Sequence, residues 1–319
     1  MGASGLGSRG IIGEFYHQLS LVTGSGWINM LGWLNPDSDQ ESETYKWLGQ
    51  VPQMREWIGG RQAKGLSEQG YTIKNVKFES TLKVSVDDLR RDKTGQIMLR
   101  IRELAKRTNT HWAQLMSALI VAGAATNCYD GQYFFDNDHS EGSSGTQINA
   151  VTADHISALN IATATAPTTA EMAEAIINTI AYMMTYVDNE GEPLNEDAKQ
   201  FLIMCPTYPI WLATRKAVGL GVITDGSGAY DNVVGALDDF KIQVVMNPRL
   251  RALTTNFFTF RTDGDMKPFI LQEELPVQMS AIAEGSELEF QEDEHHYGVK
   301  AIRNAGYGFW QSAIQATLS

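Results

Sequence analysis

The longest helical pattern in the chain lies between residues 95 and 124. Apolar side chains at Ile97, Ile101 and Leu104 recur at intervals of three and four residues. The arginine and lysine side chains of this segment lie mostly off that apolar stripe. An unbroken helix here would be roughly 40 Å long. The Thr-Asn-Thr sequence at residues 108–110 is a point at which the helix can break.

A second helix is predicted for residues 168–187. Thr168 and Glu171 have the spacing of a capping box, in which each side chain accepts a hydrogen bond from a backbone N–H of the first turn. Methionine, alanine and isoleucine side chains then follow at helical spacing along one face. A shorter helix is predicted around residues 210–218.

Residues 71–86, YTIKNVKFESTLKVSV, alternate between apolar and polar side chains. This alternation predicts a β-hairpin or two-stranded ribbon that rests on another part of the protein, because a lone hairpin is only marginally stable. Further strand patterns occur at residues 201–205, 242–246, 257–261, 269–273 and 297–303. Helices and strands in separate groups indicate the α+β class. No internal repeat is visible.

Three segments show no regular pattern. Residues 1–13 are rich in glycine and serine, which predicts a mobile arm, and residues 14–60 hold four of the seven tryptophans with little helical or strand period. Large aromatic rings bury much apolar area, so we expect residues 14–60 to pack on the protein's own body or on a neighbouring subunit. Residues 219–235 are predicted to form a flexible glycine-rich loop. The GLGSRG sequence at residues 5–10 lacks the preceding strand that a dinucleotide-binding loop needs.

Composition narrows the classes of function. The chain has 319 residues and a formal net charge of −13, which argues against a dedicated nucleic-acid-binding protein. Its two cysteines, Cys128 and Cys205, are far apart, which disfavours a disulfide framework or a structural zinc site. Neither a signal-peptide pattern nor a long apolar run is present, so we expect a soluble protein made inside the cell.

The segment YDGQYFFDNDH, residues 129–139, is the strongest candidate for chemistry. Acidic and polar side chains alternate from Asp136, as in a calcium-binding loop. That loop needs glycine and glutamate at two later positions, where Glu141 and Gln147 stand. A helix–loop–helix calcium site is therefore rejected.

Two interpretations of this segment stay open. Asp136, Asp138 and His139 would supply ligands for a looser metal site in a metal-dependent hydrolase. Alternatively, the acidic residues turn the chain at the surface, since Asp and Asn side chains hydrogen-bond to nearby backbone in turns. The chain contains neither a zinc-protease, a nucleophile-elbow nor a phosphate-loop motif. The lack of these motifs disfavours the hydrolase, and if the acidic residues form a turn we expect no catalytic residue, no metal and no cofactor.

Several motifs in a fixed order resemble the major head subunit of phage Mu, the Mu-like gpT family. These motifs are Tyr45–Gly49, Pro52, Arg55–Gly59, Phe78-Glu79, Asp87-Asp88, Tyr129–His139, Tyr297–Ala301 and Gly306–Gln311. The resemblance covers the chain from about residue 14 to its end. It implies the Hong-Kong-97-like capsid fold, with an N-terminal arm, an extended loop, a peripheral domain built on a long spine helix, and an axial domain.

The resemblance also implies a division of the chain and a set of contact residues. The expected regions are 1–65 for the arm, 66–94 for an extended β-hairpin loop, 95–154 for the peripheral domain with its spine helix, 155–255 for the axial domain, and 256–319 for a return to the peripheral domain. The expected inter-subunit contact residues are Trp47, Arg55, Glu56, Trp57, Arg61, Phe78, Glu79, Asp87, Asp88, Arg90 and Arg91.

The function implied is that of a major capsid protein, which assembles into pentamers and hexamers of an icosahedral shell around double-stranded DNA. It would be made in the bacterial cytoplasm and end in the virion, without membrane association. Expected partners are further copies of the chain, a separate scaffold, a maturation protease, a portal, a decoration protein and DNA bound without sequence specificity. The basic residues near Arg90 and the acidic segment 284–294 suggest charge pairing between subunits. A cellular nanocompartment shell of the same fold is the other alternative.

Overall fold

The computed structural model describes residues 7–21, 26–35, 38–45, 70–92, 95–225, 228–232, 234 and 239–319. The helices are α1 (Ser8–Leu21), α2 (Trp27–Leu31), α3 (Val86–Arg91), α4 (Gln96–Asn109), α5 (His111–Ala122), α6 (Thr169–Met184), α7 (Tyr208–Gly219) and α8 (Glu287–Glu292). The strands are β1 (Gly32–Asn35), β2 (Ser42–Tyr45), β3 (Tyr71–Lys74), β4 (Val76–Ser85), β5 (Ala150–Val151), β6 (Gln200–Cys205), β7 (Val222–Asp225), β8 (Gly228–Asp231), β9 (Lys241–Met246), β10 (Asn256–Arg261), β11 (Phe269–Ile282), β12 (Glu294–Tyr307) and β13 (Ala313–Thr317).

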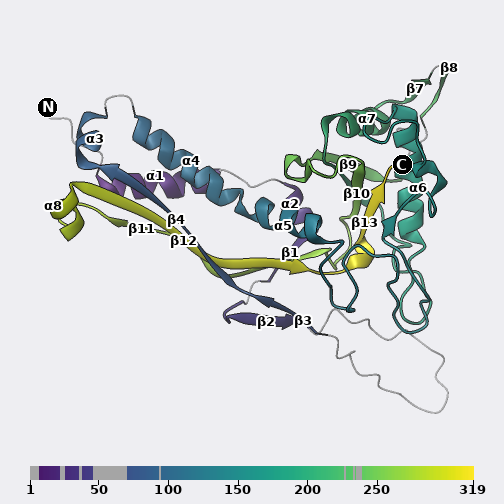
Figure 1. Ribbon diagram of the computed structural model, residues 1–319, viewed down its shortest axis with the longest axis horizontal. Helices are drawn as coiled ribbons and strands as arrows, with labels where there is room; N and C mark the ends of the chain where they lie inside the picture. Colours follow the sequence, from purple (N-terminus) through teal and green to yellow (C-terminus); the bar gives the residue numbers. More distant parts are fainter. Residues whose placement is uncertain are drawn as a thin grey trace, which may run out of the picture.

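An elongated part forms one end of the molecule, and α3 and α8 lie at its tip (Figure 1). Its four-stranded sheet has the order β1-β11-β12-β4. Alternate side chains of β12, among them Tyr297 and Val299, are buried on one face of the sheet. They share a core with Ile11 and Phe15 of α1 and with Ile101 of α4. Both helices therefore cover the same face of this sheet.

The predicted long helix is present, and it breaks where the sequence indicated. The helices α4 and α5 meet at Thr110. Arg303 of β12 lies at this junction, where it donates to the Thr108 carbonyl at 3.0 Å and to His111 Nδ1 at 3.1 Å. The guanidinium also lies 4.8 Å from the centroid of the Trp112 ring. Arg303 thus ties the junction to the sheet beneath it.

A compact part forms the other end, around a five-stranded sheet of order β5-β13-β10-β6-β9. All residues of β10 and all but the first of β6 are buried, as expected for central strands covered on both faces. The helices α6 and α7 pack against this sheet and against each other (Figure 1). The capping box predicted for α6 is confirmed, since Thr168 accepts from the Glu171 backbone and Glu171 from that of Thr168.

The prediction of a hairpin over residues 71–86 is wrong. Strands β3 and β4 both form, but β3 pairs with β2 and β4 pairs with β12. Only Asn75 separates the two strands, which leaves no room for a hairpin turn. The Asn75 backbone N–H donates to Glu41 O instead. Alternation predicts a strand, but it does not specify which strand lies beside it.

Two segments predicted to be irregular contain regular structure. The 14-residue helix α1 spans the end of the predicted mobile arm and the start of the predicted irregular stretch. Glu14 of this helix forms an ion pair with Arg102 of α4 at 2.6 Å. The predicted glycine-rich loop includes the antiparallel pair β7–β8. Helix α1 is amphipathic and strands β7 and β8 are short. Tertiary contacts therefore stabilise them more than local sequence preference does.

Two features bear on how the chain is divided. Strands β10 and β13 share one sheet with β6 and β9, so a boundary after residue 255 does not coincide with a sheet boundary. Strands β11 and β12 lie in the other sheet, so the C-terminal segment contributes to both ends of the molecule (Figure 1). Within the described ranges, none of the helices combines the length and the apolar character needed to cross a membrane.

Candidate functional site

The segment that contains the DNDH sequence turns the chain after α5 and packs it on the core. Phe134 stacks on Tyr307 with 4.6 Å between ring centroids, and Phe135 lies 5.5 Å from Phe258. Phe134 and Phe135 are both fully or almost fully buried. These rings hold the loop between the two sheets, because Tyr307 ends β12 and Phe258 belongs to β10.

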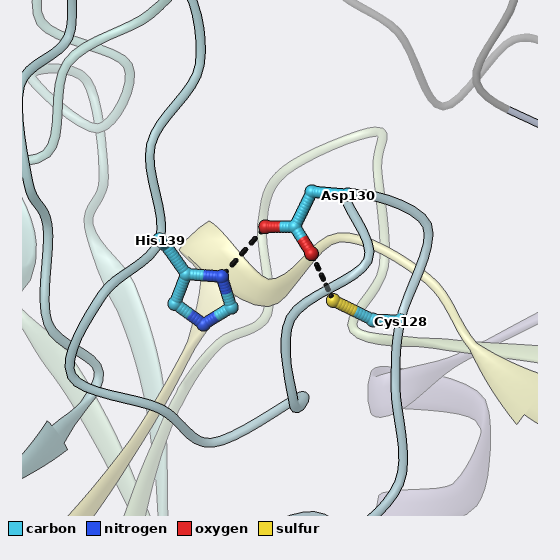
Figure 2. Close-up of side chains that lie close together, drawn as sticks. All are labelled: Cys128, Asp130 and His139. Atoms are coloured by element: carbon cyan, nitrogen blue, oxygen red, sulfur yellow. Dashed lines mark hydrogen bonds and ion pairs between the residues drawn. The ribbon is translucent and has the colours of Figure 1, made fainter.

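A buried hydrogen-bonded cluster lies in this loop (Figure 2). The Asp130 carboxylate is placed between two partners, and each of its oxygens points to one of them. His139 Nδ1 lies 2.6 Å from one oxygen, and the Cys128 thiol donates to the other at 2.9 Å. The side chains of His139 and Asp130 are 0% and 2% exposed. The cluster therefore removes a carboxylate and an imidazole from water and satisfies each with the other.

Neighbouring residues fix the histidine ring from its other sides. The ring stacks on the Trp310 indole at 3.9 Å between centroids with 9° between planes. Its Nε2 lies 3.3 Å from Asn149 Oδ1. The Tyr129 hydroxyl and the Gln311 side-chain amide are hydrogen-bonded to each other. The cluster thus joins the loop after α5 to the C-terminal segment that leads into β13.

The electrostatics of the cluster do not suit nucleophilic catalysis. Burial alone would raise the pKa of Asp130, but the hydrogen bond and charge of His139 outweigh it, and the pKa lies below its usual value. Burial, together with the neighbouring Asp130 carboxylate, raises the pKa of the Cys128 thiol. A nucleophilic cysteine needs a thiolate beside a cationic partner. Here the thiol is kept protonated and faces an anion.

The metal site considered from the sequence is not formed. Among residues with described positions, Cys128, Asp130 and His139 are the one group of three or more donors close enough to share an ion. Asp138 is exposed. Asp136 accepts hydrogen bonds from the Tyr133 and Asn137 backbones through its two carboxylate oxygens. Asp136 therefore turns the chain through its side chain, as the turn interpretation expects, whereas His139 points inward.

Asp130 is the residue that the sequence-based search for a site missed. It stands in the same motif as His139, nine residues earlier. No spacing rule connects the two, because the intervening loop determines that they meet. Cys128, interpreted as a buried free thiol, is buried and free as expected.

The predicted inter-subunit contact residues fall into two groups. Trp47, Arg55, Glu56, Trp57 and Arg61 lie outside the described residues. Phe78 and Glu79 lie on β4, and the Phe78 ring contacts His111 at 4.3 Å between centroids. Glu79 is exposed.

The four remaining contact candidates lie together on α3, at the tip of the elongated part (Figure 1). Asp87 forms ion pairs with Arg90 at 3.8 Å and with Arg91 at 2.9 Å within the helix. The Arg90 and Arg91 side chains remain 76% and 74% exposed. Asp88 is exposed as well. These side chains are available to another molecule, since exposed pairs of this kind are weak.

The chain is similar to known phage head and capsid proteins. The family model described as Mu-like prophage major head subunit gpT matches residues 34–162 and 225–318. The Mu-like prophage FluMu major head subunit of Haemophilus influenzae is 39% identical over 105 residues, 33% of this chain and 34% of that protein. The major capsid protein of Escherichia phage Mu is 36% identical over 103 residues, 32% of this chain and 34% of that protein. The aligned segment thus spans about a third of the length of each curated relative.

A solved structure extends the similarity over the remaining chain. A chain from the procapsid of bacteriophage JBD30 superposes with a TM-score of 0.53 and 25% sequence identity. The match covers 97% of this chain and 73% of that chain. The mixed α/β architecture is therefore similar to that of a phage capsid protein, of the Hong-Kong-97-like group, along nearly its whole length.

Proposed function

Because the chain belongs to the Mu-like prophage major head subunit gpT family, we propose that it is the major capsid protein of a Mu-like tailed bacteriophage. The observation that carries this proposal is the agreement of two independent similarities. The family model matches segments in both halves of the chain, and a procapsid chain superposes on 97% of it. The matched family and the curated relatives are head and capsid proteins rather than enzymes.

The proposed activity is self-assembly into an icosahedral shell around double-stranded DNA. An elongated body with different surfaces at its two ends suits heterologous contacts, in which one surface of each copy meets a different surface of the next (Figure 1). Such contacts close into rings, and rings of five and six build a shell. The buried His139–Asp130 pair then has a structural role, holding the loop after α5 in place.

The domains of the capsid fold are assigned here as part of the proposal. The antiparallel pair β2–β3 supports assigning these two strands to the extended loop, for which residues 66–94 were predicted. Helices α4 and α5 would together be the spine helix of the peripheral domain. The five-stranded sheet with α6 and α7 would form the axial domain, so β10 and β13 would belong to it as well.

The remaining partners and the location follow from the proposed function. In addition to further copies of the chain, we expect a scaffold, a maturation protease, a portal and a decoration protein. A net charge of −13 suits a shell that encloses DNA without holding it tightly. We expect assembly in the bacterial cytoplasm and a final place in the virion.

Electron microscopy of the purified protein tests the proposal. The protein is expressed alone and together with the genes that neighbour its own. Shells, tubes or rings of capsomers are the expected result. A protein that remains a compact monomer in both preparations is not a capsid protein, and the proposal is then wrong.

A further inference from the structure

The buried cluster in the loop after α5 brings three metal-binding side chains together (Figure 2). The Cys128 sulfur, a carboxylate oxygen of Asp130 and a ring nitrogen of His139 all lie within 4.8 Å of one another. The three side chains are fully or almost fully buried. A thiolate, a carboxylate and an imidazole are the kinds of ligand that Zn²⁺ takes in proteins. This donor set differs from the one considered from the sequence, which included Asp136 and Asp138.

Hydrogen bonds around His139 determine which of its ring nitrogens carries a hydrogen. Asn149 donates through Nδ2 to the Phe134 carbonyl at 2.7 Å and accepts from the Asp136 backbone through Oδ1 at 2.8 Å. These bonds fix the amide, so Oδ1 faces His139 Nε2 at 3.3 Å and makes Nε2 the donor. A histidine that binds a metal through one nitrogen usually donates from the other in this way.

The other nitrogen of the ring faces a carboxylate at short range. His139 Nδ1 lies 2.6 Å from Asp130 Oδ2. With the hydrogen on Nε2, the neutral ring directs a lone pair from Nδ1 at this oxygen. Two acceptor atoms at such a distance need a cation between them, which is either a proton or a metal ion.

A neighbouring carboxylate distinguishes these two cations. Glu141 Oε1 is buried and makes no hydrogen bond with the described part of the chain. The charges of Asp130 and His139 both act on the Glu141 carboxyl group. A proton shared by Asp130 and His139 leaves Glu141 Oε1 without a donor, whereas a water bound to a metal ion supplies one. Glu141 is also partly exposed, so an ion reaches the cluster from this side.

We propose that Cys128, Asp130 and His139 bind one Zn²⁺, with a water in the fourth position that donates to Glu141. The thiol proton and the proton shared by Asp130 and His139 are released to solvent, because the ligands bind zinc in their deprotonated forms. One thiolate and one carboxylate then balance the charge of the ion, which leaves the buried site neutral.

The observed geometry lies close to that of a zinc site. With zinc bond lengths of about 2.0–2.3 Å, tetrahedral donor atoms lie roughly 3.3–3.7 Å apart. His139 Nδ1 and Asp130 Oδ2 therefore separate by about 1 Å when the ion enters. The His139 ring stacks on Trp310, so the ion ties the loop after α5 to the C-terminal segment. Its role is structural, and it does not depend on the proposed function.

Removal and return of zinc test the site on the purified full chain. After treatment with a chelator, the wild type should bind one Zn²⁺ per chain and melt at a higher temperature with it. Cys128→Ser is the test variant, since a serine hydroxyl still donates to Asp130 but is a poor zinc ligand. Its affinity for Zn²⁺ should fall by more than about 100-fold, because loss of an outer partner alone costs about 10–100-fold.

The matched control changes the other buried free thiol. Cys205→Ser lies in β6, beside Thr214, and should bind Zn²⁺ as the wild type does. Cys128→Ser should melt like the zinc-free wild type, which shows that its fold is retained. Cobalt(II) in place of zinc should give a thiolate-to-cobalt charge-transfer absorption in the wild type and in Cys205→Ser, but not in Cys128→Ser.

Two results overturn the inference. Equal Zn²⁺ affinity of the wild type and Cys128→Ser would place the ion elsewhere on the protein. A wild type that binds no Zn²⁺ and shows no charge-transfer absorption with cobalt(II) would leave the cluster as a hydrogen-bonded one. Both results leave the proposed function standing, because shell formation is measured separately by electron microscopy.

Discussion

At the scale of single residues, the interior is held by a few buried polar side chains that meet across long stretches of sequence. Arg303 contacts residues at the junction of α4 and α5, and Asp130 contacts His139 beneath Trp310. Each buried charge has a partner, which reduces the cost of its desolvation. Removal of one partner should therefore be more costly than the loss of an exposed ion pair.

Asp130→Asn should lower the free energy of unfolding by about 3 kcal/mol, because the buried His139 loses its charged partner. The control is Asp138→Asn, because Asp138 is exposed and directly precedes His139. This variant should change the free energy of unfolding by less than about 0.5 kcal/mol. Urea denaturation of the unassembled subunit measures both. Equal stabilities of the two variants would show that the buried pair does not stabilise the fold.

His111 should make stability depend on pH. Burial, followed by the charges of Arg303 and Arg249, lowers its pKa to about 4 in the folded protein. An unfolded histidine titrates near about 6.5. Between these two pH values the unfolded chain binds more protons, so the stability present above pH 6.5 is lost as the pH falls toward 4.

The variant His111→Gln tests this dependence, since a glutamine carbonyl can still accept from Arg303. The melting temperature of the wild type should fall more steeply than that of the variant between about pH 6.5 and 4. Parallel melting curves for the two proteins over this range would exclude His111 as the titrating group.

At the scale of elements, the chain brings strands together by close backbone contact as well as by side-chain packing. The β2–β3 pair packs on β12 at Gly306. A methyl group on this glycine would lie 2.6 Å from Ile73 Cγ1 and 2.9 Å from Tyr71 Cε1. At such distances the Ile73 and Tyr71 side chains must shift, so glycine is the residue that lets them pack directly on the β12 backbone.

Gly306→Ala should lower the free energy of unfolding by about 1–3 kcal/mol, because the added methyl group overpacks the contact with β3. Gly298→Ala on the same strand is the matched control. A methyl group there would meet Thr81 Oγ1 at an ordinary 3.5 Å. Chemical denaturation measures the free energy of unfolding of both variants. If Gly306→Ala loses no more stability than Gly298→Ala, the prediction is contradicted.

Strand β11 shows how one residue shapes an element. Its pairing with β12 shifts register between Leu275 and Gln278. Pro276 lies within this interval and lacks the backbone N–H that a ladder hydrogen bond needs. The bulge is therefore a local consequence of sequence inside a strand that is otherwise 14 residues long.

At the scale of the whole molecule, charge is distributed so that exposed basic and acidic groups lie at one tip. The arginines of α3 form ion pairs only within their own helix, as far as the described residues go, and three of the six residues of α8 are glutamates. A subunit that assembles through this tip needs these charges for association, whereas its own folding does not depend on them.

Reversal of Arg90 and Arg91 to glutamate should impair assembly and leave the subunit folded. The control is the reversal of Arg215 and Lys216, an adjacent exposed basic pair on α7 in the compact part. Circular dichroism should show that the wild type and both variants are folded. Electron microscopy should show few shells only for the α3 variant. Normal shells from that variant would rule out a role for these charges in assembly.

The sequence by itself determined much of the local structure. Spacing of apolar side chains located α4, α5, α6 and most strands, and the Thr108–Thr110 step located the helix junction. The capping box at Thr168 is a contact between near neighbours, so a short pattern was enough to predict it. The order of motifs along the chain also indicated the family, because such motifs are properties of the sequence itself.

Only the tertiary structure decided which elements lie side by side. The partners of β3 and β4, the packing of α1 on α4 and the meeting of Asp130 with His139 all join residues whose spacing follows no local period. A strand pattern specifies which face is buried but not the neighbouring strand.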